Sequence, residues 1–263
     1  MGQYYKVAFK REQDTKPIVN DRKVKGQDYI MAKLMEHGYM LNPLCMSVAK
    51  MLEDGKCRLA WVGDYADEDV EKVTGGELKY EDVWGGDVNE THVFRSAKNF
   101  SYGGKYLVNH TKKEYISFDR YVNRHVALKG VEDDESKWML SPFTILTAVG
   151  NGQGGGDYFG LEMKRVGSWA WDEISIEKTV PEGFTLLDIV FEEGMEDPKE
   201  ETPSGKKVWR VSVHLAGAVD VKVSADTEDE AGEIAKELAP SLVTGMEVAD
   251  TEVLTATPEG SAE

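Results

Sequence analysis

The feature that most limits how this chain folds is a run of glycines in the segment AVGNGQGGGDYFG, residues 148–160. Five of the seven positions from Gly150 to Gly156 are glycine. Glycine loses more backbone freedom on folding than any other residue, so such a run destabilises a fold unless the site requires it. We therefore expect a loop here that either adopts positive φ angles or lies very close to another group.

The run partly matches known nucleotide-binding loops. Gly150, Gly152 and Gly155 fit the pattern G-x-G-x-x-G, and the apolar run Thr144–Val149 before them predicts a strand. A dinucleotide site also needs a helix whose N-terminus faces the pyrophosphate. The segment DYFGLEMKRVGSWAWDEI that follows indicates a second strand instead, and no Gly-Lys-Ser/Thr continues the run as in a P-loop. The sequence therefore argues against both loops.

Three interpretations of the glycine run stay open: a structural connection, a loop that binds a ligand or partner, and a catalytic loop. Tight turns use glycine for positive φ angles, but one or two residues are enough for a turn. A longer run fits a close approach to another chain, or a nest of N–H groups that binds an anion. Asp157 at the end of the run would then position a hydroxyl, a cation or a base edge.

The word Gly-Asp-Tyr occurs twice, at Gly63–Tyr65 and at Gly156–Tyr158, each time after a predicted strand. If Asp64 and Asp157 share a cleft, the two carboxylates would bind a metal or perform acid–base chemistry. If they do not, each forms an independent turn. The neighbouring acidic residues from Asp64 to Asp69 predict the solvated start of a helix.

His110 lies in a predicted hairpin turn near Lys112 and Lys113, where it would either act on a phosphate or simply face solvent. No complete catalytic constellation is visible, so no catalytic residue is assigned and the question of enzymatic activity stays open. The candidate ligand-binding residues are Gly152, Gly154, Gly155, Gly156, Asp157, Tyr158, Asp64, Tyr65 and His110.

The two cysteines, Cys45 and Cys57, lie in apolar segments, and we expect both to be reduced core residues. The five histidines are scattered, so no metal site is predicted.

The chain begins with a strand-like segment in place of a signal peptide and has no run of apolar residues long enough to span a membrane, which predicts a cytoplasmic protein without membrane contact.

The formal net charge of −17 argues against direct binding to a nucleic-acid backbone, which needs clustered Lys and Arg. Two interpretations of this acidity stay open. It keeps a protein soluble, or its carboxylates imitate phosphates and occupy a basic groove on another protein.

The apolar patterns predict an α+β fold: a main domain over residues 1–191, with a mixed or antiparallel sheet and short helices. Trp169 and Trp171, two positions apart, would share one face of a strand. Helices are expected at residues 28–37 and 43–53, and loops or irregular structure at 11–27, 72–104 and 119–135. Strands are expected at residues 3–10, 57–62, 105–108, 114–118, 144–149 and 163–177, and residues 184–191 form a further apolar run.

A linker rich in Pro, Gly, Ser and charge is predicted at residues 192–207. Beyond it, residues 208–257 predict a small α+β module of a β-hairpin, a helix and a last strand, followed by a tail at 258–263. The hairpin strands are expected at 208–215 and 219–223. A capping box at Thr227–Glu230 opens the helix, which Pro240 ends, and the last strand is expected at 246–255.

Several segments over about residues 1–177 resemble a family of proteins from bacteria and their phages, often gut Firmicutes and actinobacteria, for which no activity is established. They are MGQYYK, LMEHGY, WVGDYADED, KYLVNHTKKEYI, GNGQGGGDYFG and VGSWAWDEISIE. The C-terminal module is similar to hairpin–helix domains appended to mobile-element proteins. The resemblance implies a phage or prophage setting.

In that setting the chain would be an accessory protein that acts by binding a small phosphorylated ligand or a host protein through the glycine loop. An acidic inhibitor of a host nucleic-acid or defence enzyme is the alternative hypothesis. A nucleotide hydrolase that uses Asp64, Asp157 or His110 is a third and weaker one. No cofactor is assigned.

Overall fold

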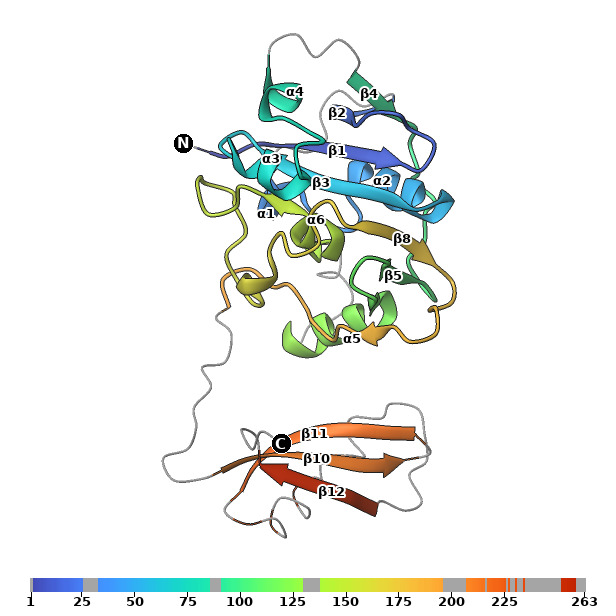
Figure 1. Ribbon diagram of the computed structural model, residues 1–263, viewed down its shortest axis with the longest axis vertical. Coiled ribbons are helices and arrows are strands. Elements are labelled where there is room, and N and C mark those ends of the chain that lie inside the picture. Colours follow the sequence, from blue (N-terminus) through green and yellow to red (C-terminus); the bar gives the residue numbers. More distant parts are fainter. Residues whose placement is uncertain are drawn as a thin grey trace. The chain divides into compact units, whose positions relative to one another are not determined.

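A computed structural model describes residues 2–25, 33–85, 91–129, 138–195, 207–215, 217–225 and 252–258, together with Thr227, Glu230 and Ile234. The chain divides into two compact units, Met1–Asp197 and Pro198–Glu263 (Figure 1). This division falls inside the segment 192–207 whose composition predicts a linker. The start of that segment nevertheless belongs to the first unit, because Glu192 is buried there and Glu193 forms a β-bridge with Gly160.

The first unit is built on a nine-stranded sheet. Its strands are β1 (Tyr5–Arg11), β2 (Ile18–Val24), β3 (Cys57–Gly63), β4 (Thr91–Phe94), β5 (Tyr106–Asn109), β6 (Glu114–Ser117), β7 (Ala148–Val149), β8 (Glu173–Glu177) and β9 (Thr185–Leu186). They follow the order β4-β2-β1-β3-β8-β5-β6-β9, and β7 pairs with β3. The pairs β2–β4, β3–β7 and β6–β9 are parallel and the others are antiparallel. This mixed, mostly antiparallel sheet with short helices confirms the predicted α+β class.

Six short α-helices and one 3₁₀ turn accompany the sheet. They are α1 (Leu34–His37), α2 (Pro43–Asp54), α3 (Asp69–Thr74), α4 (Tyr80–Trp84), α5 (Phe118–Lys129), α6 (Pro142–Leu146) and η2 (Met163–Arg165), counted over the described residues. The helix α2 begins as the sequence predicts, because Pro43 occupies its first turn and the side chain of Asn42 accepts a hydrogen bond from the N–H of Leu44. Of the helix predicted at 28–37, residues 28–32 lie outside the described residues.

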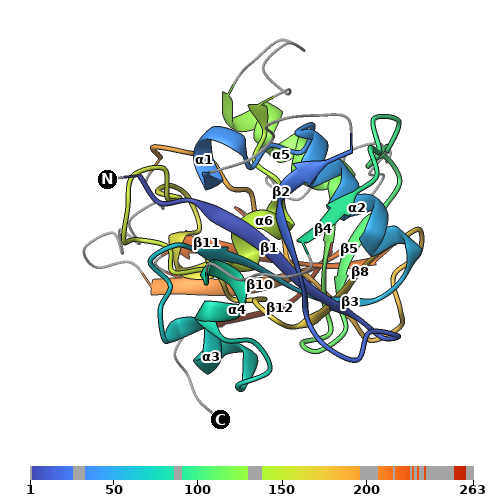
Figure 2. The same ribbon diagram turned by 90° about the horizontal axis from the view of Figure 1, so that it is seen from above.

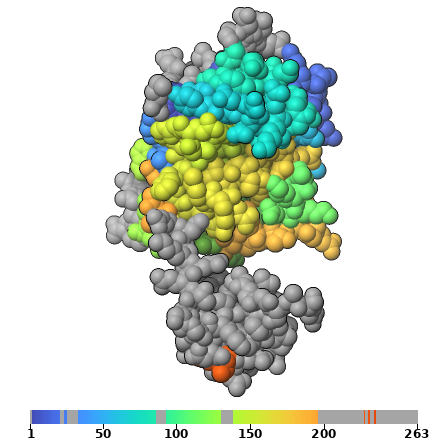
Figure 3. Space-filling model, turned by 60° about the vertical axis from the view of Figure 1, so that its left-hand side comes forward, coloured from blue at the N-terminus to red at the C-terminus, as the bar shows by residue number. Residues whose placement is uncertain are grey.

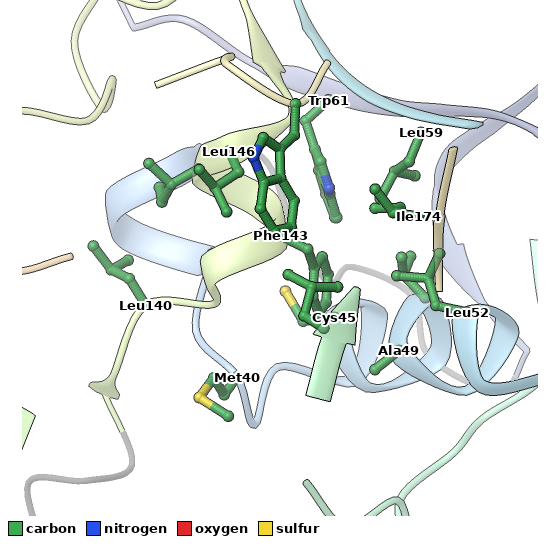
Figure 4. Close-up of a cluster of buried hydrophobic side chains, with 14 of the residues drawn as sticks. Met40, Cys45, Ala49, Leu52, Leu59, Trp61, Leu140, Phe143, Leu146 and Ile174 are labelled. Atoms are coloured by element: carbon green, nitrogen blue, oxygen red, sulfur yellow. The ribbon is translucent and has the colours of Figure 1, made fainter. Parts of the chain in front are cut away.

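The sheet has a core on each face. Along β1, Val7 and Phe9 pack into the larger core, whereas Ala8 between them packs into the smaller one. Figure 2 shows α1, α2 and α5 on one side of β1 and β3, and α3 and α4 on the other. In the larger core, side chains of α2 and α6 surround Trp61 of β3 (Figure 4). Both cysteines are reduced and buried, as predicted.

Three segments that were predicted to be loops or irregular contain helices or strands. Residues 11–27 contain β2, which forms a hairpin with β1; residues 72–104 contain α4 and β4; and residues 119–135 contain most of α5. Two of them bury few of the side chains that the structure describes: Val83 is buried in α4 and Phe94 in β4. In α5 the buried residues are Phe118, Tyr121 and His125, which recur at helical spacing, so the prediction of a polar loop overlooked this period.

Two predicted strands are wrong in part. Residues 144–149 form the end of α6 and the short strand β7, because Pro142 begins a helix that buries both sides of its apolar run. Residues 163–177 form η2, a turn and then β8, so Trp169 and Trp171 do not share a strand face. Trp169 packs in the larger core and Trp171, with φ +63°, packs in the smaller one.

The second unit contains a three-stranded antiparallel sheet of β10 (Lys207–Leu215), β11 (Gly217–Ala225) and β12 (Glu252–Pro258), in the order β11-β10-β12. The first two strands agree with the predicted hairpin. The last strand, predicted at 246–255, coincides with β12 at residues 252–255, and residues 246–251 lie outside the described residues. The predicted helix after Thr227 lies mostly outside the described residues, although the Thr227 hydroxyl accepts the capping hydrogen bond from the Glu230 N–H at 3.2 Å. Of the predicted tail, Pro258 ends β12, and residues 259–263 lie outside the described residues.

Candidate functional site

The glycine loop closes around a carboxylate of its own chain. One oxygen of Asp157 (Oδ2) accepts hydrogen bonds from the N–H groups of Gly152, Gln153 and Gly154, each at 2.8 Å. The other oxygen (Oδ1) accepts a 2.6 Å hydrogen bond from the hydroxyl of Tyr5. Successive N–H groups of this kind form an anion nest, and here the anion that the nest holds is Asp157. An external phosphate would have to displace this buried side chain.

Glycine is required in the loop for two reasons. Gly150, Gly152 and Gly156 have φ angles of +89°, +96° and +88°, which residues with a side chain rarely adopt. Gly154 has a different constraint, because a Cβ atom there would lie 2.6 Å from the Cβ of Gln3. Gln3 runs beside the loop and donates its N–H to the carbonyl of Gly155 at 2.8 Å. The glycines therefore allow the backbone to form the nest, and they leave room for the N-terminal segment to pack against the loop.

The two Gly-Asp-Tyr words bind successive residues of the N-terminal segment. Asp64 accepts the N–H of Tyr4 at 2.9 Å through its side chain, and its own N–H donates to the carbonyl of Tyr4 at 2.9 Å. Asp157 binds the hydroxyl of Tyr5, the next residue. In Figure 3 the yellow segment that contains the glycine loop lies beside the cyan segment that follows β3. Each carboxylate holds the start of β1, and neither lines the cavities described below.

The two tyrosines of these words differ in role. The hydroxyl of Tyr158 is buried, donates to the carbonyls of Leu161 and Glu192, and accepts the N–H of Glu192. Tyr65 is half-buried at the surface. The loop is closed on itself by Asn151, whose side chain exchanges two hydrogen bonds with the backbone of Tyr158, at 2.7 and 3.0 Å.

His110 is not an exposed turn residue, and it does not join the two aspartates. Its Nε2 atom lies 2.7 Å from the hydroxyl of Ser175 and 3.1 Å from the carboxylate of Glu177, to which Ser175 also donates at 2.7 Å. Burial and the positive charge of Lys56 lower the pKa of His110. A catalytic Ser–His–acid triad needs the serine and the acid on different ring nitrogens, so this arrangement is a buried polar network.

The pairing of the strands shows how far His110 is from the glycine loop. Tyr5 pairs with Gly63 at one end of β3, and Ile174 pairs with Cys57 at the other end. Six residues of strand separate the two ends, about 20 Å at the usual rise per residue. The sequence-predicted site residues therefore form two separate groups.

A cavity of about 330 Å³ opens near the Cys57 end of β3, between the ends of β1, α2 and β4. Its cationic lining comes from Arg11, Lys50, Lys56 and Arg95, against a single lining carboxylate, Asp54. Met51, Val93 and Phe94 give it an apolar part. We name this the basic cavity. A smaller cavity of about 200 Å³ shares Arg11 and Lys56 with it and adds Lys10 and Arg58, with Glu12, Glu77 and Glu173.

Most cations of the basic cavity have a carboxylate partner. Arg11 forms a two-pronged pair with Asp14 at 2.8 and 2.9 Å, and Lys56 lies 3.3 Å from Glu173. Lys50 pairs with Asp54 and Glu53. Arg95 differs from these, since it makes no ion pair with any residue that the structure describes. These cations come from distant parts of the chain, so no local pattern in the sequence marks them as a site.

Comparison of the chain with protein-family models, with curated proteins and with solved structures finds no significant match. Within the described ranges, no three or more His, Cys, Asp or Glu side chains are grouped so as to hold a metal ion. No helix in the same ranges is long and apolar enough to cross a membrane.

Proposed function

We propose that this protein is a cytoplasmic binding protein of phage or mobile-element origin, and that its ligand is a small phosphorylated molecule held in the basic cavity. The observation that carries the proposal is the charge contrast. Four cationic side chains line one cavity of a chain whose formal net charge is −17. Clustered cations would favour a negatively charged ligand, although the protein as a whole is itself negative.

The basic cavity has the size and composition that a small ligand needs. Ligand pockets commonly measure about 300–1,000 Å³ and combine apolar walls with a few charged groups, and this cavity measures about 330 Å³. Arg95 offers a guanidinium fork that matches a phosphate group. Met51 and Phe94 would contact the organic part of the ligand.

The glycine loop is the less favourable place for the same ligand. Its three inward N–H groups already bind Asp157, and removing a buried carboxylate from three hydrogen bonds costs several kcal/mol, about 1.5–3 for each bond to a charged group. A hydrolase that combines Asp64 or Asp157 with His110 in one site is likewise disfavoured, because these groups lie at opposite ends of β3.

The test is an NMR and calorimetric titration of the full chain with adenosine 5′-monophosphate, inorganic phosphate and adenosine. We expect the nucleotide to shift amide signals around Arg95 and Lys56 and to leave those of Gly152–Gly154 in place. Arg95→Gln should weaken binding by at least about tenfold, as the loss of a charged hydrogen bond implies. The matched control Lys72→Gln, on the exposed side of α3, should have no effect. Shifts at the loop with no effect of Arg95→Gln would overturn the proposal.

A second candidate function is inhibition of a basic host protein, such as a nucleic-acid or defence enzyme. Five carboxylates exposed around α3 and α4 make no ion pair with the described residues: Asp67, Glu68, Asp69, Glu71 and Glu81. Carboxylates arranged in this way would compete for a basic groove. Reversing the charge of Glu68, Asp69 and Glu71 together should abolish such binding, whereas Arg95→Gln should leave it unchanged.

A further inference from the structure

A second cavity, of about 170 Å³, has a lining unlike that of the basic cavity. It lies between the turn after α1, residues 138–140 and the end of the first unit, and α5 forms one wall. Tyr39 and Trp138 provide its aromatic surface, Glu192 and Glu193 its carboxylates, and His125 and Lys129 its remaining polar groups.

The aromatic rings of this cavity meet edge to face and form a corner. The centroids of Tyr39 and Trp138 are 5.1 Å apart and their planes meet at 77°. The backbone brings the two segments together, because Tyr39 forms an antiparallel bridge with Leu140 and the N–H of Met40 donates to the carbonyl of Met139 at 2.9 Å. Trp138 is nevertheless 64% exposed. A large aromatic side chain that packs against a second ring and is open to solvent offers a contact surface for a ligand.

The two carboxylates of the cavity are in different states. Glu192 is buried and accepts from His125 at 2.8 Å and from Lys129 at 2.5 Å, so its charge is compensated. Glu193 is exposed and makes no ion pair with any described residue. Burial, followed by the negative charges of Glu193, Glu36 and Glu192, raises the pKa of Tyr39. Glu193 is therefore the carboxylate of this cavity whose charge no described residue compensates.

We propose that the corner of Tyr39, Trp138 and Glu193 is a binding site for a small organic cation that carries an ammonium group. A cation over the face of Trp or Tyr is attracted by the ring quadrupole, and Trp is the strongest partner. The carboxylate of Glu193 would neutralise the bound charge. The ammonium group of Lys129 already neutralises Glu192 in the same cavity, so Glu193 is the carboxylate left for the bound cation. The site is independent of the basic cavity and of the function proposed for it.

The test uses the full chain and two probes of nearly the same shape, choline and its neutral isostere 3,3-dimethyl-1-butanol. Binding is followed by NMR at the indole N–H signal of Trp138, which Trp138→Phe identifies among the six tryptophans of the chain. We expect choline to shift this signal and the neutral isostere to bind at least about threefold more weakly, as an exposed cation–π contact implies. n-Butylammonium serves as a second cationic probe, and a preference for it would indicate a lysine side chain as the natural source of the ammonium group.

Variants separate the contribution of each wall. Trp138→Leu and Glu193→Gln should each weaken choline binding about threefold or more, in line with a single exposed cation–π or ion-pair contact, whereas Trp138→Phe should retain most of it. Glu68→Gln on α3 is the matched carboxylate control and should change nothing. Both main substitutions are at exposed positions, so a thermal melt should show folded proteins. Equal binding of choline and its isostere, or full binding by Trp138→Leu, would overturn the proposal.

Discussion

The hydroxyl of Tyr5 and the carboxylate of Asp157 are joined by a 2.6 Å hydrogen bond, although 152 residues separate them in the chain. Both side chains are buried. The bond attaches the first strand of the sheet to the glycine loop, and the same carboxylate organises the loop itself. Asp157 therefore both stabilises the glycine loop and fixes the start of β1 against it.

Replacing Asp157 with Ala should destabilise the first unit by about 4 kcal/mol or more, because the change leaves three N–H groups and one hydroxyl without their acceptor. Guanidinium denaturation of the variant and the parent measures the difference. Asp64→Ala, which removes one side-chain hydrogen bond at a half-buried position, is the matched control and should cost about 1 kcal/mol. If the two variants are equally stable, the nest does not organise the loop.

Gly154→Ala should also destabilise the protein, by about 2 kcal/mol, the usual cost of overpacking. A Cβ at this position would lie 2.9 Å from the backbone nitrogen of Gln3 and 2.6 Å from its Cβ, so the N-terminal segment must move. Gly55→Ala is the control, since Gly55 has an extended φ of 166° and no atom within 4 Å of an added Cβ. Thermal melts of both variants report the difference, and equal melting temperatures would contradict this interpretation of the glycine run.

The sequence was sufficient to predict elements with a strong local signal. The strand β3 and the helix α2 were correct to within one residue, because an apolar run or a capping pattern marks each of them. The segment of α6 was predicted as a strand, since a run of five apolar or small residues buried on all sides has no period that distinguishes helix from strand. Helix α5 was not predicted, because its many polar residues indicated a loop, although Phe118, Tyr121 and His125 recur at helical spacing.

The candidate site was harder to predict than the fold. The positive φ angles and the close approach expected at the glycine run are present, but the anion in its nest is Asp157 of the same chain. The distance between the loop and His110 depends on the pairing of β3 with β1 and β8. The basic cavity was not predicted at all. Its lining cations come together only when the sheet has formed, because Arg11 ends β1, Lys56 precedes β3 and Arg95 follows β4. The acidic composition of the whole chain gives no indication of a basic site.

Stability should fall steeply as the pH rises above about 9–10. Burial raises the pKa of Cys57 from 9.0 to about 12, and burial also raises the pKa values of Tyr5, Tyr102 and Tyr121 above 10.0. Because these groups keep their protons in the folded protein, their contribution to stability is fully present below the pKa values of the unfolded chain. It is lost as the pH rises from the unfolded to the folded pKa values, where only the unfolded chain releases these protons. Each such group contributes a slope of about 1.4 kcal/mol per pH unit in that window.

Denaturation midpoints measured from neutral pH to strongly alkaline pH test this dependence. In Tyr5→Phe the free energy of unfolding should fall less steeply with pH above pH 10 than in the parent, by about 1.4 kcal/mol per pH unit. The reason is that one group that titrates differently in the folded and unfolded states is removed. A constant midpoint across the alkaline range would show that the buried tyrosines and Cys57 do not control stability there.

His110 should titrate below its ordinary pKa of 6.5, because burial and then the charge of Lys56 disfavour its protonated form. NMR titration of the imidazole signals measures the value. Lys56→Gln should raise the pKa of His110 by removing a positive neighbour, and Glu177→Gln should lower it further by removing a negative one. Lys72→Gln should leave it unchanged. Because Lys56 also lines the basic cavity, a phosphate bound there should raise the pKa of His110 in the parent protein. The absence of that rise at saturating nucleotide would place the ligand elsewhere.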